Sequence, residues 1–255
     1  MTSTLPNWVR FVAPVVVGVA ILAVWMLVVD VLEAAPRALP GPIAVAEEFV
    51  KRFGIISEDV VITATNALIG LAVGAVFAIL FAALAATFPP IDGMLAPIVA
   101  AVAVVPIVAL TPILNTMFGA SSQFGRMSVA AIAAFVPVFV NVLRGLRQTR
   151  PVHRDLLRAS AASPLQTFRT LTLPTALPYL VTGLRIASSV AVIAALVAEY
   201  FGGPADGIGT SIATYAKSGR ASLAFAYVVG GIAIGLTFFL VTSLLERIVT
   251  RRKPV

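Results

Sequence analysis

Long stretches without a charged residue constrain this chain more than any other feature of its sequence. No Asp, Glu, Lys or Arg occurs from Val60 to Thr87 or from Gly93 to Gly125. A bilayer core is about 30 Å thick, and a helix crosses it with about 20 apolar residues. Only 11% of all residues are charged and 60% are hydrophobic, whereas a soluble domain carries about 25% charged residues. We therefore expect a polytopic membrane protein.

Six apolar segments are long enough, or nearly so, to cross a bilayer. They are continuously apolar and do not alternate, which favours helices over the strands of a membrane barrel. We expect an all-α bundle that forms a single membrane domain over residues 1–255, with the first segment retained rather than cleaved as a signal peptide. The predicted spans are Phe11–Leu32, Val60–Thr87, one within Gly93–Gly125, Met127–Leu143, Tyr179–Phe201 and Ala221–Leu245.

The distribution of arginine and lysine predicts the orientation. With the N-terminus in the cytoplasm, the inner side holds Arg10, the arginines from Arg144 to Arg169 and the basic tail after Arg247. The outer side holds fewer basic residues, among them Arg126. Cytoplasmic loops carry the excess of positive charge, so both termini are expected in the cytoplasm of a cell with a cytoplasmic (inner) membrane. The net charge of +7 then reflects topology, and no nucleic-acid partner is expected.

Small and ring-constrained residues predict how the spans pack and bend. Gly70 with Gly74, and Gly231 with Gly235, have the small-xxx-small spacing that lets two helix backbones approach closely. Prolines interrupt or kink helices because they lack an amide hydrogen. The third and fourth predicted spans contain the prolines Pro97, Pro106, Pro112 and Pro137. Outside the spans, Ala44–Phe53 has the pattern of a short amphipathic helix at the membrane interface.

The longest inner connection, from Arg144 to Pro174, is the most informative stretch. Pro151 suits the first position of a short helix. Ser163 suits an N-cap, with Pro164 at the first helical position and Gln166 at the third, which is the spacing of a capping box. We expect two short helices joined by a turn, forming a stiff protrusion. Such a protrusion suits the transmission of a partner's motion into the spans.

The string DLLRASAASPLQTFRTLTLPTALPYLVTGLRIA resembles the EAA loop of permease subunits of ABC importers with the type I fold. Asp155 takes the position of the glutamate, Leu156 and Leu157 those of the two alanines, and Ala161 that of the glycine. Two other stretches, VVPIVALTPILNTMFG and AEYFGGPADGIG, resemble the same family. The resemblance covers residues 59–247, with the coupling loop at residues 150–174. Within the family, the branch for nitrate, sulfonates such as taurine, pyrimidine precursors of thiamine, and riboflavin is the most similar.

The resemblance implies a function and a set of partners. The expected function is that of a permease subunit which moves a small solute by alternating access. Two cytoplasmic ABC ATPase subunits, an extracytoplasmic solute-binding protein and a second permease copy, by default in a homodimer, are the implied partners. The first short helix of the loop would be the coupling helix that docks on the ATPase. The residues assigned to this contact are Val152, His153, Asp155, Leu156, Leu157, Arg158 and Ala161.

An alanine at position 161 departs from the family pattern, which has glycine there. Ala161 must either avoid a left-handed backbone conformation or adopt it at a cost of about 1 kcal/mol. His153 is the only histidine, so it cannot build a metal site, and it is expected on the solvated surface or at the ATPase contact. Arg185 is expected to extend toward the inner boundary of its span.

Four polar residues in or near the spans are candidates for a gate or for the solute path. Asn66, Thr111 and Asn115 could face a cavity, and helix–helix hydrogen bonding is the alternative for each. Glu199 lies near the outer end of the fifth span, where a gate, a partner contact and a hydrogen-bonded structural acid next to Gly202–Gly203 are all consistent with the sequence.

The chain contains no sequence motif for catalysis. No phosphate-binding loop of the form G-x-x-x-x-G-K-[ST], no H-E-x-x-H and no cysteine is present. The chain is therefore expected not to be an enzyme and to need no cofactor, with ATP hydrolysis on another subunit. The alternative is a secondary transporter or channel without an ATPase, which would need acids at the bilayer midplane.

Overall fold

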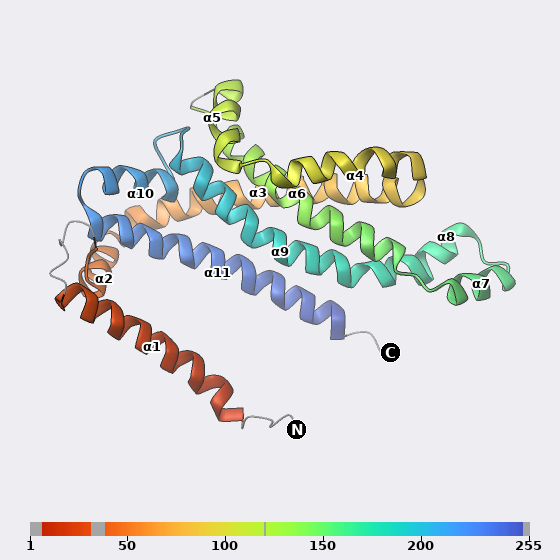
Figure 1. The fold of residues 1–255 in the computed structure, drawn as a ribbon, viewed down its shortest axis with the longest axis horizontal. Coiled ribbons are helices and arrows are strands. Elements are labelled where there is room, and N and C mark those ends of the chain that lie inside the picture. Colours follow the sequence, from red (N-terminus) through yellow and green to blue (C-terminus); the bar gives the residue numbers. More distant parts are fainter. Residues whose placement is uncertain (1–6, 32–38, 120, 252–255) are drawn as a thin grey trace.

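The computed structural model describes residues 7–31, 39–119 and 121–251, and all of its regular elements are helices. Figure 1 shows their arrangement. The elements are α1 (Asn7–Val31), α2 (Pro42–Lys51), α3 (Phe53–Thr87), α4 (Pro89–Val104), α5 (Ile107–Phe118), α6 (Phe124–Arg147), α7 (Pro151–Ala159), α8 (Pro164–Thr167), the π-helical segment η1 (Phe168–Thr172), α9 (Leu173–Tyr200), α10 (Ile208–Lys217) and α11 (Ala221–Arg251).

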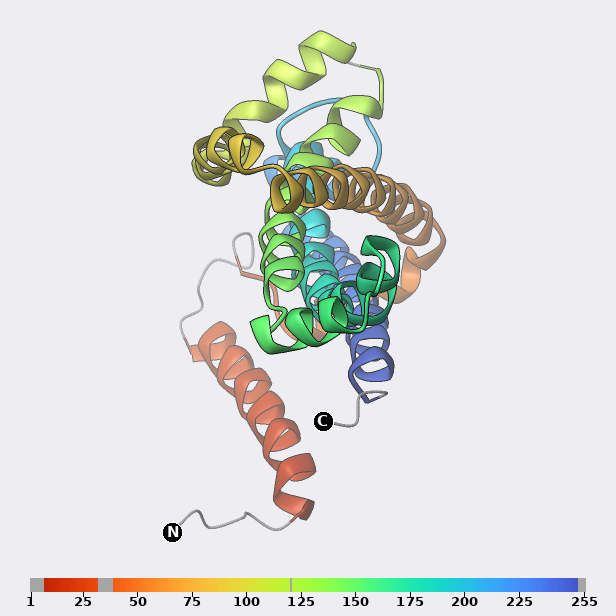
Figure 2. The same cartoon turned by 90° about the vertical axis from the view of Figure 1, so that its right-hand side faces the viewer.

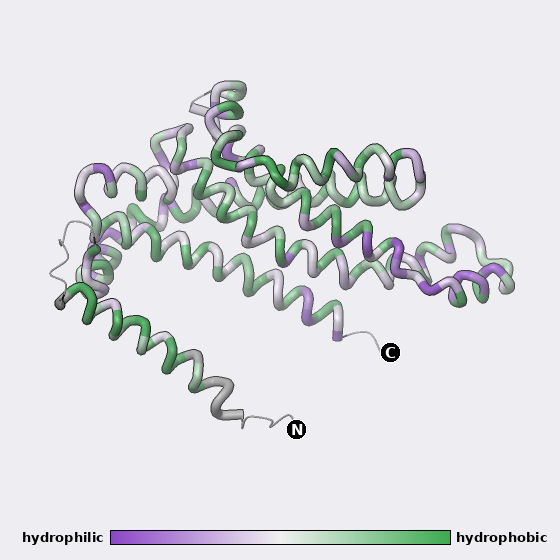
Figure 3. Tube along the Cα trace, viewed as in Figure 1, coloured by the Kyte–Doolittle hydropathy of each residue, from purple (hydrophilic) through white to green (hydrophobic). Residues whose placement is uncertain are grey.

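Four helices are long and apolar enough to cross a membrane. They are α3, α6, α11, and α9 with the short α8 and η1 segments that lead into it. α6 packs between α3 and α9, and α11 lies along α9. Figure 3 shows that these helices are mainly hydrophobic along their length, while hydrophilic residues gather where α6 ends and along α7. The all-α membrane fold predicted from the sequence is confirmed.

The third predicted span is not one straight helix. α4 and α5 meet at a bend of 98° with a short break between them. Val105 is extended, as the residue before a proline prefers, and Pro106 has no amide hydrogen with which to continue the helix. Pro97, Pro112 and Pro137 lie inside helices. Of the four prolines, Pro106 is therefore the one that stands at a break.

The first predicted span corresponds to α1, whose described apolar part is Val15–Val29. Leu32, the predicted last residue of that span, lies outside the described residues, as do the predicted inner residues Arg252 and Lys253. With α1 and the bent α4–α5 pair added to the four long helices, the elements match the six predicted segments in order. The predicted interfacial helix Ala44–Phe53 is α2, which begins two residues earlier, at Pro42.

One of the two glycine pairs makes the close helix contact predicted from its spacing. A Cβ at Gly70 would clash with the Cβ of Ala130, and one at Gly74 with the carbonyl oxygen of Ala131, both on α6. Only glycine lets α3 lie this close to α6. The pair on α11 differs, because Gly235 has nothing within 4 Å of its ideal Cβ.

The helices define two ends of the bundle. α3, α6 and α11 run toward the end that carries α7 and α8, here named the α7 end, and α9 runs back from it. α1 runs toward α2 and stands apart from the other helices over most of its length (Figures 1 and 2). The opposite end, here named the α10 end, carries α2, α10 and the start of α3.

Candidate functional site

The α7 end presents a short helix that projects from the bundle (Figure 1). α7 contains no buried residue. Val152 is 74% exposed and Leu156 65% exposed, while Leu157 is only half-buried. Asp155 and Arg158 are exposed and lie 3.6 Å apart, with no other ion-pair partner among the described residues. Exposed apolar side chains with charged neighbours are typical of a surface that contacts another protein.

A hydrogen-bonded turn ends α7 and leads into α8. Ala161 has φ 53°, so it adopts the left-handed conformation that its glycine-like position in the loop required. The amide of Ala162 donates to the carbonyl of Leu157 at 3.0 Å, and the amide of Ala161 donates to Arg158 at 3.0 Å, which is the pattern that ends a helix through a left-handed residue. The strain of about 1 kcal/mol is therefore present and is balanced by these bonds.

The predicted capping box at the start of α8 is confirmed. The amide of Ser163 donates to Gln166 Oε1 at 2.7 Å, and the amide of Gln166 donates to Ser163 Oγ at 3.3 Å. Pro164 occupies the first helical position. The two caps, one on each side of the turn, make α7 and α8 a stiff unit.

Ion pairing fixes the helices from which α7 projects. Arg147, in the last turn of α6, lies 2.8 Å from Asp92 in the first turn of α4 and also donates to the carbonyl of Ala85 on α3. Gly145 packs against Tyr179 of α9. Four helices, α3, α4, α6 and α9, therefore meet near the base of α7.

At the α10 end, Glu199 is 1% exposed and accepts hydrogen bonds from two other elements. Thr63 Oγ1 donates to its Oε2 at 2.8 Å, the amide of Gly209 donates to the same oxygen at 3.0 Å, and Asn66 Nδ2 lies 3.4 Å from its Oε1. The carboxylate thus joins α3 to the first turn of α10. Two of the four gate candidates, Asn66 and Glu199, are in direct contact.

Arg126 is the second buried charge at this end. Its side chain is 0% exposed, and Nη1 lies 2.7 Å from Asp206 Oδ1. Nη2 donates to the carbonyl of Pro204 at 2.6 Å and to Thr210 Oγ1 at 3.0 Å. The sequence assigned Arg126 to the predicted outer side and gave no sign that its side chain is buried. α6 begins at Phe124, and its first turn carries the guanidinium inward to bind the loop after α9.

Gln123 links the two buried charges. Its Oε1 accepts from Asn66 Nδ2 at 2.9 Å and from Arg126 Nη1 at 3.1 Å, and its Nε2 donates to Asp206 at 2.9 Å. Asp59 adds a second anchor for α10, because it accepts from the amide of Gly207 at 2.9 Å. We name this set the α10-end network: Asp59, Thr63, Asn66, Gln123, Arg126, Glu199, Asp206 and Thr210.

The other two gate candidates lie on α5 and do not belong to the α10-end network. Thr111 is fully buried and donates to the carbonyl of Ile107 in its own helix. Asn115 is 6% exposed, and neither its Nδ2 nor its Oδ1 has a hydrogen-bond partner among the described residues. The structure therefore places the four candidates in two groups, one hydrogen-bonded and one on a helix with few polar contacts.

Arg185 was predicted to extend toward the inner boundary of its span, and the structure shows that it forms an ion pair with Glu246. Its Nη1 lies 3.0 Å from Glu246 Oε2 on α11. Thr182 donates to the same carboxylate at 2.6 Å, and the hydroxyls of Ser188 and Thr242 lie 3.0 Å apart. The pair fastens α11 to α9 and is a structural contact.

Residues 74–254 match the family model described as "Binding-protein-dependent transport system inner membrane component". The chain belongs to this family. A protein of Haemophilus influenzae described as "Probable ABC transporter permease protein" is 27% identical over 94% of this chain and 98% of its own length. The formylaminopyrimidine transport permease protein ThiX of Halalkalibacterium halodurans is 32% identical over 74% of this chain and 75% of its own.

A solved structure has the same fold. It is a chain of the MetNI methionine ABC transporter, from a structure of its inward-facing conformations, with a TM-score of 0.68 and 18% identity. The match covers 78% of this permease and 98% of the MetNI chain. The type I permease fold predicted from the resemblance is confirmed, and the chain is a multi-pass membrane permease of the ABC importer family.

The family match covers the α7–α8 loop and most of the α10-end network. Asp59, Thr63 and Asn66 precede the matched residues, although they bind α10 and Glu199 in the permease. Sequence reasoning identified Asn66 and Glu199 but missed Arg126, Gln123 and Asp206 as members of one site. The only sequence signal for Arg126 was its place as the first charge after the uncharged stretch Gly93–Gly125.

Proposed function

We propose that this permease docks on a separate cytoplasmic ABC ATPase through α7. The observation that carries the proposal is the exposure of Val152 and Leu156 on a helix whose turn is fixed by Ala161 and by the Ser163–Gln166 capping box. An apolar surface of this kind gains free energy when a partner covers it. A stiff support lets the partner's movement reach α6 and α9 instead of bending the loop.

The same proposal includes the rest of the assembly. The α7 end lies in the cytoplasm together with both termini, two ATPase subunits bind there, and a solute-binding protein delivers solute to the α10 end. A second copy of the chain completes the solute path in a homodimer. ATP-driven closure of the ATPases moves the two α7 helices and switches the path between inward and outward openings. His153 and Arg158, exposed beside Asp155, are further contact residues.

The proposed solute is small and of the vitamin-precursor or nitrate and sulfonate type. The relative ThiX, which is named for formylaminopyrimidine, supports the first alternative. The solute bound by the partner binding protein would identify it directly.

A matched pair of substitutions tests the docking proposal. Val152 on α7 and Val50 on α2 are both 74% exposed, at opposite ends of the bundle. Val152→Asp should lower the amount of ATPase that co-purifies with the permease by about tenfold or more, since it places a charge in an apolar contact. Val50→Asp should leave the ATPase bound. Asp155→Ala and Leu157→Ala should release it as well.

Two results would contradict the proposal. One is an undiminished ATPase yield with the Val152, Asp155 and Leu157 variants. The other is solute transport by the purified permease alone down an ion gradient, which would support the secondary transporter or channel.

A further inference from the structure

α5 is connected to the rest of the permease by a sharp bend before its first residue and by a glycine after its last residue. The break at Val105 and Pro106 turns the chain by 98°, and Gly119 after α5 has φ 93°. The helix itself is apolar and carries no charged residue. Its position is therefore set by packing against α6 and α9 rather than by ion pairs.

The face of α5 toward the bundle carries Asn115, whose side-chain amide lies in a narrow slot between Gly125 and Gly202. Gly125 of α6 presses on the Asn115 side chain so closely that a Cβ there would clash with Oδ1, and a Cβ on Gly202 would lie 3.1 Å from Nδ2. Both polar atoms of the amide are buried without a hydrogen-bond partner among the described residues. Burial of an amide without hydrogen-bond partners is unfavourable. A position of α5 that gives the amide partners would therefore be favoured on this count.

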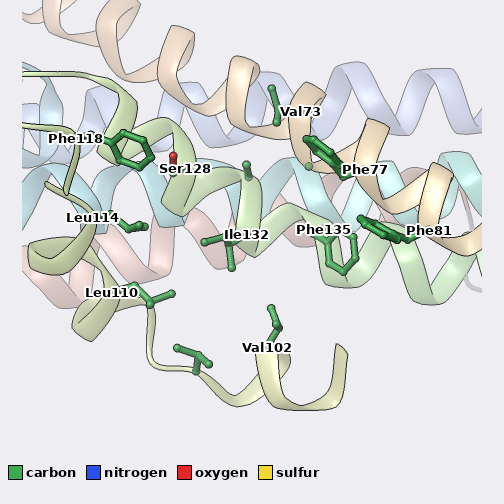
Figure 4. A pocket seen from close by; sticks show the side chains of 13 residues that line it. Val73, Phe77, Phe81, Val102, Leu110, Leu114, Phe118, Ser128, Ile132 and Phe135 are labelled. Atoms are coloured by element: carbon green, nitrogen blue, oxygen red, sulfur yellow. The ribbon is translucent and has the colours of Figure 1, made fainter. Parts of the chain in front are cut away.

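Room for such a movement exists on the neighbouring face of α5. A cavity of about 570 Å³ lies between α3, α4, α5 and α6. Figure 4 shows Leu110, Leu114 and Phe118 of α5 on one side of it, with Phe77 of α3 and Ile132 of α6 among the side chains on the other. Its lining is almost entirely apolar, so α5 could shift into it without burying another polar group.

We propose that α5 is a gate helix that pivots at Val105–Pro106, and that Asn115 leaves the Gly125–Gly202 slot when it does. In the present position the amide of Asn115 is buried in this slot. After the pivot, Asn115 faces water or solute, and the cavity beside Leu110 and Leu114 receives the helix. The inference rests on the proposed function, because ATP hydrolysis by the partner supplies the energy for the movement.

The absence of cysteine from the chain makes a direct test available. Asn115→Cys places the sole thiol in the slot. The full transporter, with its ATPase and binding protein, is reconstituted in vesicles and treated with a small charged methanethiosulfonate reagent. Labelling should be slow at rest and rise about tenfold or more during ATP hydrolysis, as expected when a buried group opens. Val129→Cys on α6, which replaces a side chain 1% exposed, should stay unlabelled throughout.

A second pair of variants tests the slot without ATP. Gly125→Ala adds a methyl group 3.2 Å from the backbone N and Cα of residue 115 and should force α5 out, which raises labelling of Asn115→Cys at rest. Gly93→Ala on α4 is the control, because nothing lies within 4 Å of its added Cβ.

Unchanged labelling of Asn115→Cys during confirmed ATP hydrolysis, together with no effect of Gly125→Ala, would overturn the gate and leave the importer function standing. Failure of any ATPase to co-purify would instead overturn the proposed function.

Discussion

The two ends of the bundle differ in the burial of their charged residues: Arg126 and Glu199 are buried at the α10 end, whereas the charged residues of α7 are exposed. At the α10 end, Arg126 and Glu199 are buried and bind groups from α3, from α10 and from the loop between α9 and α10. On α7, Asp155 and Arg158 are exposed, and the only ion pair that either side chain forms among the described residues is with the other. A buried charge must be paired to be tolerated, and its pairing holds elements together. An exposed charge adds little stability. The α10 end is therefore held together by buried polar contacts, whereas the charges of α7 add little to the stability of the bundle.

Among the substitutions that test this difference, one at Arg126 should have the largest effect on stability. Arg126→Ala leaves Asp206, Gln123 and the carbonyl of Pro204 without their donor. We expect a loss of about 3 kcal/mol in the free energy of unfolding. Thermal unfolding of the purified permease measures it. Lys217→Ala, at an exposed lysine of the same end, should change it by less than about 0.5 kcal/mol. Equal effects of the two variants would remove the distinction between buried and exposed charge.

Glu199 should give the next largest effect. Glu199→Ala removes the acceptor for Thr63 and for the amide of Gly209, which lie on different elements. Leaving two buried donors unpaired should cost about 2 kcal/mol. Hydrogen exchange of the α10 amides is the sharper measurement, because their protection should fall more than that of α9. Unchanged protection in α10 would show that Glu199 does not hold this helix.

A smaller change of opposite sign is expected at the turn after α7. Ala161→Gly relieves the left-handed strain at φ 53° and should stabilise the turn by about 0.5–1 kcal/mol, less the added freedom of glycine in the unfolded chain. The amide of Ala162, bonded to Leu157, should then exchange more slowly. Ala162→Gly, at a residue without positive φ, should have the opposite effect. Faster exchange in Ala161→Gly would show that the alanine is not strained.

Surface substitution on α7 should have the smallest effect on stability. Val152→Ser changes a side chain that is already 74% exposed, and the free energy of unfolding should stay within about 0.5 kcal/mol. Thermal unfolding of the permease alone measures this. A large loss would mean that α7 is packed on the bundle in the native protein, and its description as a free contact surface would be wrong.

Local signals in the sequence predicted the α7 end well. The capping box needs only Ser163 and Gln166, three residues apart, and the helix start needs only Pro151. The sequence did not decide whether Ala161 adopts the left-handed conformation, because a positive φ at an alanine depends on the hydrogen bonds made by the whole turn.

The α10 end was poorly predicted because its contacts are distant in the chain. Thr63 and Glu199 are 136 residues apart, and Arg126 and Asp206 are 80 apart. No periodicity or cap signals such pairs. The sequence showed that Asn66 and Glu199 were unusual polar residues, but only the fold shows that they touch. The sharp bend at Val105–Pro106 is an intermediate case, since proline predicts an interruption but not its angle.

The placement of α7 in the cytoplasm is the central claim, and labelling from outside the cell tests it most directly. Ser160→Cys, after α7, and Ser218→Cys, after α10, each place the sole thiol at an exposed position at one end of the bundle. A membrane-impermeant thiol reagent applied to intact cells should label Ser218→Cys and should label Ser160→Cys only after the cells are broken. Labelling of Ser160→Cys in intact cells, with protection of Ser218→Cys, would contradict the proposed orientation and with it the docking of an ATPase on α7.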